Sequence, residues 1–170
     1  AALATAAALA RRAVALAARG APGAPVTVSA FNLGMHALIG AWLRHAFWAV
    51  ANEAAGAEAD SYLVTPDATV RVRIADPRAA VAHARDSAAR VETTALPLFP
   101  RAARELLEGG SAQKLHDAVF GDEAGWSTGE IEKPWFAALY RDGQPDLGEV
   151  AQLAREVYGP ILANCEIGKA

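Results

Sequence analysis

Histidine and cysteine side chains are the first candidates for catalysis or metal binding, and this 170-residue chain has four histidines and one cysteine. A zinc-binding helix places two histidines four residues apart or gives them a carboxylate partner. His36 and His45 lie on different parts of one expected helix, and His83 and His116 are isolated, so we predict structural or surface roles and no metal site. Cys165 lies near a chain end that we expect to fray, with no histidine placed beside it, so we predict no cysteine nucleophile.

Lysines and carboxylates are the second set, because a Mg²⁺-dependent nuclease site combines an aspartate with an (Asp/Glu)-x-Lys triplet. The carboxylates hold the metal and the lysine orients the attacking water. An alanine or an isoleucine stands two positions before each of Lys114, Lys133 and Lys169, so no such triplet exists and we predict no catalytic residue. Glu130 and Glu132 flank Lys133 in an expected loop and are interpreted as a solvated charge cluster. No glycine-rich phosphate loop is present, so we expect no cofactor.

Arginines are the candidates for DNA contact. Arg71 and Arg73 alternate along an expected strand, so both side chains point to the same face of the sheet. We predict that they bind phosphates without reading the base sequence, although scattered, solubilising arginines are the alternative. The net charge of −3 and the pI near 5.8 give no global attraction to nucleic acid or lipid. The arginines that could extend this pair into a basic strip are Arg44, Arg78, Arg85, Arg90, Arg101 and Arg104.

The four tryptophans fall into two predicted classes. Trp42 and Trp135 lie at helical core spacing and are predicted to be buried. Trp48 and Trp126 are predicted to bind a partner subunit, because aromatic anchors dominate protein–protein contacts.

The composition limits the class of protein. A hydrophobic fraction of 53% and a charged fraction of 21% are typical of a folded domain. We expect residues 1–170 to form a single domain. Because the chain does not begin with Met, we expect it to be a fragment of a larger protein. One cysteine excludes an internal disulfide and suits the cytoplasm, where we place the protein. No apolar run approaches the roughly 20 residues that span a bilayer, so we expect no membrane partner.

Hydrophobic periodicity and turn residues predict the elements along the chain. The first 19 residues have the composition of an organellar transit peptide, but their leucine spacing fits an amphipathic helix equally well, and we expect the helix. The first half then gives a strand at residues 26–31, a helix at 35–50, a polar turn at 53–58, and two strands, 61–64 and 69–74, that form a hairpin.

The second half is predicted to be mainly helical. Asp76 and Pro77 form a good helix start, and Asp146 with Glu149 has the pattern of a capping box. Between these starts we expect an interruption at residues 96–100, short helices at 101–107 and 112–120, a loop at 121–129 and a helix from Pro134. The predicted fold class is mixed, helix-rich α/β, with a small sheet of about three strands covered by helices.

Several segments occur in the order and spacing of one protein family. Residues 38–45, LIGAWLRH, resemble a helix with leucine, tryptophan and histidine at its core, and residues 96–101, LPLFPR, resemble a "PLPFFP" segment. Trp126 with Gly129 and Glu130 echoes a "W…GE" element, and residues 151–162 resemble the segment that closes the family's sequence. Over roughly residues 33–164 the chain thus resembles the C-terminal domain of RecC, the gamma subunit of bacterial exodeoxyribonuclease V. The resemblance is weakest over the first 32 residues.

This resemblance implies a domain with the fold of the PD-(D/E)XK nucleases that has lost its metal site. It implies a non-catalytic role in a RecBCD-type helicase–nuclease complex, with the beta and alpha subunits and DNA as partners. The domain would pack against the helicase–nuclease beta subunit and guide DNA during double-strand break repair. Enzyme activity would then belong to the ATP-dependent complex as a whole.

Two other functions remain open. One is a degenerate or partner-completed nuclease related to AddB, which the missing (Asp/Glu)-x-Lys triplet and the missing cysteines disfavour. The other is a helical adaptor that does not act on DNA, for which the near balance of acidic and basic residues is the best support.

Overall fold

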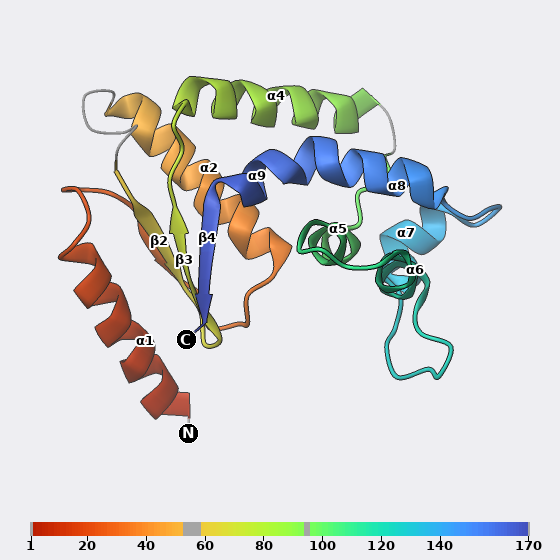
Figure 1. Cartoon of the computed structure of the whole chain (residues 1–170), viewed down its shortest axis with the longest axis horizontal. Coiled ribbons are helices and arrows are strands. Elements are labelled where there is room, and N and C mark those ends of the chain that lie inside the picture. Colours follow the sequence, from red (N-terminus) through yellow and green to blue (C-terminus); the bar gives the residue numbers. More distant parts are fainter. Residues whose placement is uncertain (1, 53–58, 94–95, 170) are drawn as a thin grey trace. The chain divides into compact units, whose positions relative to one another are not determined.

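The computed structural model describes residues 2–52, 59–93 and 96–169, and the turn predicted at residues 53–58 lies outside them (Figure 1). The fold is mixed α/β and 57% helical, with a four-stranded sheet packed against helices, which confirms the predicted fold class. The chain forms two compact units. Unit 1 combines residues 1–86 with residues 161–170, and unit 2 consists of residues 87–160.

Unit 1 is built around the sheet, whose strands lie in the order β1-β2-β3-β4. β1 is parallel to β2, whereas β3 is antiparallel to both of its neighbours. The elements of this unit are α1 (Ala2–Ala17), β1 (Val26–Val28), α2 (Met35–Ala51), β2 (Ser61–Val64), β3 (Ala68–Val72), β4 (Cys165–Lys169) and the first part of α4 (Pro77–Thr93).

The fourth strand corrects the sequence prediction of about three strands and a frayed chain end. Cys165 pairs with Val72 and Lys169 pairs with Ala68, so the segment completes an antiparallel ladder with β3. Pairing satisfies backbone groups of β3 that would otherwise face solvent. The segment contains only one β-branched residue, Ile167, and no aromatic residue, so its composition did not identify it as a strand.

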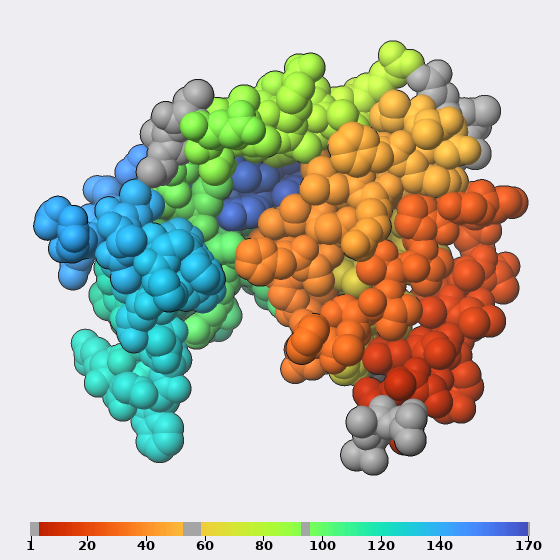
Figure 2. Space-filling model, turned by 180° about the vertical axis from the view of Figure 1, so that it is seen from behind, coloured from red at the N-terminus to blue at the C-terminus, as the bar shows by residue number. Residues whose placement is uncertain are grey.

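Different helices cover the two faces of the sheet, as Figure 1 shows. The register aligns one residue of each strand in a row on the same face, namely Thr27, Leu63, Val70 and Ile167. α2 covers this face, where His45 contacts Ser61, and Figure 2 shows α2 in orange at the surface of unit 1. α1 lies on the opposite face, where Arg12 donates to the carbonyl oxygens of Thr65 and Ala68, each at 3.1 Å.

The core of unit 1 lies between α2 and the sheet. Leu38 and Trp42 of α2 and Leu63 and Val70 of the sheet are each at most 1% exposed. The predicted burial of Trp42 is therefore confirmed. Because the apolar residues of α2 recur at three and four positions, one face of the helix meets the sheet along its length.

Unit 2 is helical and has its own core. Phe99 and Phe136 stack with ring centroids 4.2 Å apart, and Leu115, Val119 and Val150 surround them. The elements are α5 (Pro100–Leu107), α6 (Ala112–Phe120), the short 3-10 helix η1 (Glu130–Glu132), α7 (Pro134–Leu139), α8 (Leu147–Leu153), the π-helical segment η2 (Ala154–Tyr158) and α9 (Gly159–Ala163), which continues into unit 1.

Trp135 contradicts the prediction of a buried side chain, since it is 64% exposed. α7 has only six residues and begins at Pro134. It directs Phe136 onto Phe99, so the preceding side chain faces outward over Lys133, whose Nζ lies 5.9 Å from the Trp135 ring. The spacing of apolar residues was compatible with either aromatic residue in the core, and the three-dimensional path of the chain selects Phe136.

Two predicted helix starts are confirmed in the structure. Asp76 accepts a hydrogen bond from the Ala79 amide, and Asp146 accepts one from the Glu149 amide, both at 2.9 Å. The π-helical segment η2 ends at Tyr158, two residues before Pro160. Proline has no amide hydrogen to continue the α-helical ladder, and the wider turns of η2 accommodate this break.

Candidate functional site

Arg71 and Arg73, the predicted DNA-contacting residues, both reach the carboxylate of Asp60. Arg73 Nε lies 2.7 Å from Asp60 Oδ1, and Arg71 Nη1 lies 3.9 Å from Asp60 Oδ2. Arg71 also forms an ion pair with Glu166 of β4. The structure therefore brings the two guanidinium groups together, as their alternation predicted, but it places them beside two carboxylates. A phosphate would have to compete with both acids at this position.

The other arginines of the predicted strip differ in their partners. Arg44 is distinct, because its Nη1 donates to the Thr27 hydroxyl at 3.3 Å and no carboxylate among the described residues lies within ion-pair distance of it. The engaged arginines are Arg85 with Asp86 (3.3 Å), Arg90 with Glu156 (3.2 Å), Arg104 with Glu108 (2.7 Å) and Arg101 with the Thr128 carbonyl oxygen (3.1 Å).

Trp126 lies on a loop of unit 2 and is 90% exposed. The Trp126 amide donates to Asp122 Oδ1 at 2.8 Å, and the Asp122 amide donates to the Ser127 carbonyl oxygen at 3.2 Å. An isolated β-bridge between Gly121 and Thr128 closes the base of the loop. The large aromatic ring is thus presented to solvent by a backbone that is fixed through its own hydrogen bonds.

Trp48, the other predicted partner contact, is half-buried on α2. Its ring centroid lies 5.9 Å from that of His45, and a Cβ atom at Gly23 would lie 3.7 Å from its Nε1 atom. Trp48 therefore packs within unit 1 and offers only part of its ring to a partner.

Glu130 contradicts the interpretation as a solvated charge, since it is only 2% exposed. Its Oε2 accepts from the Ala102 amide at 2.9 Å, and its Oε1 lies 3.0 Å from Lys133 Nζ. The carboxylate thereby supplies an acceptor to the first turn of α5, where helical amides lack partners. Burial of Tyr158, and to a smaller extent the negative charge of Glu130, raises the pKa of Tyr158 to about 12.

His45 and Ser61 form a pair that the sequence did not reveal, with Nδ1 and Oγ 2.7 Å apart. Both side chains are buried, at 0% and 2% exposure, so a substrate has no access to the hydroxyl. Burial lowers the pKa of His45, and the negative charge of Asp60 partly offsets this effect. The pair therefore joins α2 to β2 and does not form a nucleophile and base.

Cys165 lies on β4, where burial raises its pKa to about 12. A thiol with so high a pKa is protonated at neutral pH, whereas the thiolate is the reactive nucleophile. The surroundings of Cys165 are therefore those of a structural cysteine.

Neither a metal site nor a membrane span is found in the part of the chain that the structure describes. Within residues 2–52, 59–93 and 96–169, no three histidine, cysteine or acidic side chains gather as metal ligands. The helices in these ranges are too short or too polar to cross a membrane.

Comparisons with known proteins assign no family to the chain. A scan against protein-family models and a search of curated proteins both find no match. The function is therefore inferred from the geometry of the residues above and from the resemblance of the segments that contain them.

Proposed function

We propose that this chain is a non-catalytic scaffolding domain of a RecBCD-type helicase–nuclease, which docks onto the helicase–nuclease beta subunit and guides DNA in double-strand break repair. The observation that carries the proposal is the 90% exposed Trp126 ring on its hydrogen-bonded loop. An exposed tryptophan on a fixed backbone loses little conformational entropy on binding, and tryptophan is enriched among the residues that dominate interfaces.

Four of the positions that carry the resemblance to RecC support the proposal, because the fold uses them as core residues, whereas Trp126, which also carries it, is exposed. Trp42 and Phe99 are each 1% exposed, Glu130 is 2% exposed and Tyr158 is 6% exposed. They come from different segments of the chain, in the order that the family has. A shared fold would account for the retention of these residue types at these positions.

The chemistry of the described residues favours a scaffold over a partner-completed nuclease. The His45–Ser61 pair is buried, the Cys165 thiol is protonated, and no acidic cluster capable of holding Mg²⁺ occurs in the described ranges. A partner subunit would have to supply both the metal ligands and the lysine.

Size-exclusion co-elution with the beta subunit of the same organism tests the proposal. We expect the wild-type chain to co-elute, and we expect Trp126→Ala to weaken the complex by at least about tenfold, since loss of a buried aromatic anchor costs about 2 kcal/mol or more. Trp135→Ala is the matched control, because it removes another exposed tryptophan of unit 2. Trp48→Phe tests the second predicted contact while keeping most of the local packing.

Separate elution of the wild-type chain and the beta subunit would contradict the proposal. Equal losses in Trp126→Ala and Trp135→Ala would contradict the assignment of Trp126 as the anchor, because that result indicates nonspecific adhesion of exposed rings.

A further inference from the structure

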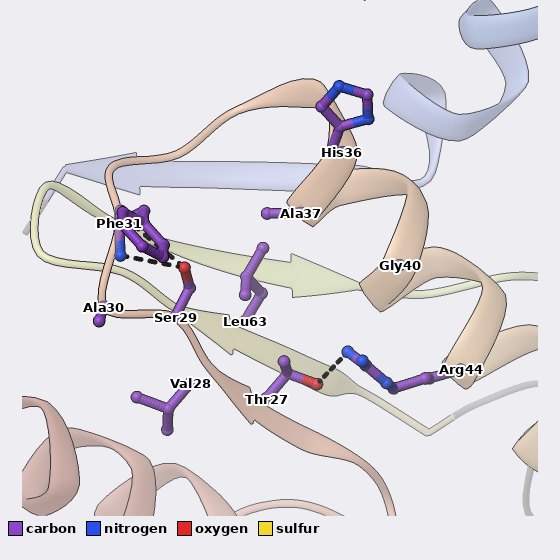
Figure 3. Close-up of a pocket in the computed structure, with 10 residues that line it drawn as sticks. All are labelled: Thr27, Val28, Ser29, Ala30, Phe31, His36, Ala37, Gly40, Arg44 and Leu63. Atoms are coloured by element: carbon purple, nitrogen blue, oxygen red, sulfur yellow. Dashed lines mark hydrogen bonds between the residues drawn. The ribbon is translucent and has the colours of Figure 1, made fainter.

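An open pocket of about 360 Å³ lies in unit 1 between β1, the loop that follows it and the first half of α2. Figure 3 shows Phe31 of the loop and Arg44 of α2 on opposite sides of this space, with Leu63 of β2 and Thr27 of β1 between them. The small residues Ala37 and Gly40 form the α2 side of the pocket. Because neither fills the space, the pocket stays open between the aromatic ring and the guanidinium group.

The lining of this pocket carries the positive charge of Arg44. Among the described residues that line it, Arg44 and His36 are the ionisable ones, and none is a carboxylate. The Arg44 guanidinium donates to Thr27 Oγ1 and has no acidic partner among the described residues. Arg71 and Arg73 are different, since each has a carboxylate within ion-pair distance. In a chain with a net charge of −3, an arginine that has no carboxylate partner among the described residues and lies beside a pocket favours an anionic ligand.

Phe31 presents an aromatic face from a fixed loop, and 81% of the residue is exposed. The Phe31 amide donates to Ser29 Oγ at 3.2 Å, and the Leu33 amide donates to Asp67 Oδ1 at 2.8 Å. Asp67 also accepts from the Thr65 hydroxyl, so its carboxylate is engaged in holding the loop. An exposed ring with a fixed backbone suits stacking on a flat, unpaired base.

We propose that this pocket binds one nucleotide of single-stranded DNA, with the base stacked on Phe31 and the phosphate held by Arg44. The pocket volume lies within the range of small-ligand sites, about 300–1,000 Å³. The bases of a duplex are stacked on one another, so only an unpaired strand can give a base to Phe31. The inference rests on the proposed function only in the choice of DNA over RNA.

Fluorescence anisotropy of the whole chain with a labelled oligo(dT) of about 15 nucleotides tests this site. We expect Phe31→Ala to weaken binding about tenfold, as loss of one base–aromatic stack does. Arg44→Gln should weaken binding. It should also reduce the slope of log Kd against the logarithm of the salt concentration by about 0.7, the value for one phosphate contact on a single strand. Arg85→Gln is the matched control, because it removes the same charge from an exposed, acid-paired arginine of unit 1.

Several outcomes would overturn the inference. In the first, the wild-type chain fails to bind oligo(dT), and in the second it binds duplex DNA with equal affinity. In a third outcome, Arg71→Gln weakens the binding of oligo(dT) while Arg44→Gln leaves it unchanged. A poly-glutamate peptide that binds through Phe31 and Arg44, when oligo(dT) does not, would assign the pocket to an acidic protein segment. Tighter binding of oligo(rU) than of oligo(dT) would overturn the choice of DNA.

The DNA titration uses the chain without its proposed partner. Its failure is therefore distinguishable from failure of the proposed function, which would appear as separate elution from the beta subunit.

Discussion

His45 is a buried ionisable residue that the fold keeps neutral. Its Nδ1 atom contacts Ser61 Oγ at 2.7 Å, and its Nε2 atom is buried with no hydrogen-bond partner among the described residues. Burial lowers the pKa of the imidazole below its ordinary value of 6.5, because a charged ring would lose its hydration without gaining a direct ion pair. Asp60 raises the pKa through its charge, but this effect is smaller than that of burial.

The free energy of unfolding of unit 1 should therefore decrease as the pH falls, and His45 should account for part of this decrease. The unfolded chain takes up a proton near pH 6.5, whereas the folded chain resists it to a lower pH. The contribution of neutral His45 to the free energy of unfolding is fully present above pH 6.5. It is lost as the pH falls toward the folded-state pKa, by up to about 1.4 kcal/mol for each pH unit. Urea denaturation between pH 7.5 and 5.5 measures this loss, which His45→Asn should reduce. Identical pH dependence of the two proteins would assign the titration to another group.

The burial of a residue could be predicted where the spacing of apolar residues was unambiguous. It could not be predicted where it depends on contacts with residues that are distant in the sequence. Trp42 lies in the middle of a regular apolar stripe, and its burial followed from the spacing alone. Glu130 is the first residue of the short helix η1, after a loop, and its sequence neighbours indicated exposure to solvent. Its burial depends on the amide of Ala102, which is 28 residues away and could not be located from the sequence.

The element that contains Glu130 also depends on a close backbone approach at Gly129. A Cβ atom at this position would lie 2.3 Å from the Phe120 carbonyl carbon and 2.5 Å from the Val119 oxygen. Both are backbone atoms at the end of α6, so they cannot move aside as a flexible side chain can. The absence of a side chain at Gly129 lets η1 begin directly against α6.

Gly129→Ala should consequently destabilise unit 2 by about 2–3 kcal/mol, because the clash forces the loop away from α6. Gly159→Ala is the matched control, since a Cβ atom at this helical position would meet nothing within 4 Å apart from its chain neighbours and the backbone of its own helix. That substitution should be neutral or should stabilise by up to about 1 kcal/mol. Urea denaturation followed by circular dichroism compares the two variants. Equal stability of Gly129→Ala and the wild type would show that the loop can relax at little cost.

Helix starts were the elements best predicted from the sequence, because a cap is a local feature. Asp76 and Asp146 each bond an amide three residues later, so the determining atoms are neighbours in the chain. The strand Cys165–Lys169 was missed because its pairing partner is remote in sequence and because it has only one β-branched residue, Ile167, and no aromatic residue. The pocket beside Phe31 was missed for a similar reason, since its lining comes from β1, α2 and β2 together.

The whole chain has a discontinuous unit 1, since residues 161–170 return to the sheet after unit 2 has been completed. β4 pairs with β3 along its full length, from Cys165 opposite Val72 to Lys169 opposite Ala68. The ladder and the Arg71–Glu166 ion pair are thus the contributions of this returning segment to β3.

Removal of residues 165–170 should lower the protection of amide hydrogens against exchange in unit 1 but not in unit 2. We expect hydrogen exchange of the β2 and β3 amides to accelerate at least about tenfold, while α5 and α6 of unit 2 retain their protection. Glu166→Gln is the control, because it removes the ion pair and keeps the strand, and it should change exchange only slightly. Equal acceleration in the two units would mean that they unfold together, as expected for the single domain that the sequence predicts.

The pairing of β3 with β4 also has a consequence for biosynthesis. Val72 and Cys165 are 93 positions apart, and Ala68 and Lys169 are 101 positions apart. At about 5–20 residues per second, a ribosome needs roughly 5–20 s to make the intervening chain. During that time the β3 edge stands open to other strands, which is the condition that promotes aggregation. The nascent chain should therefore depend on chaperones from the time β3 leaves the ribosome until β4 does.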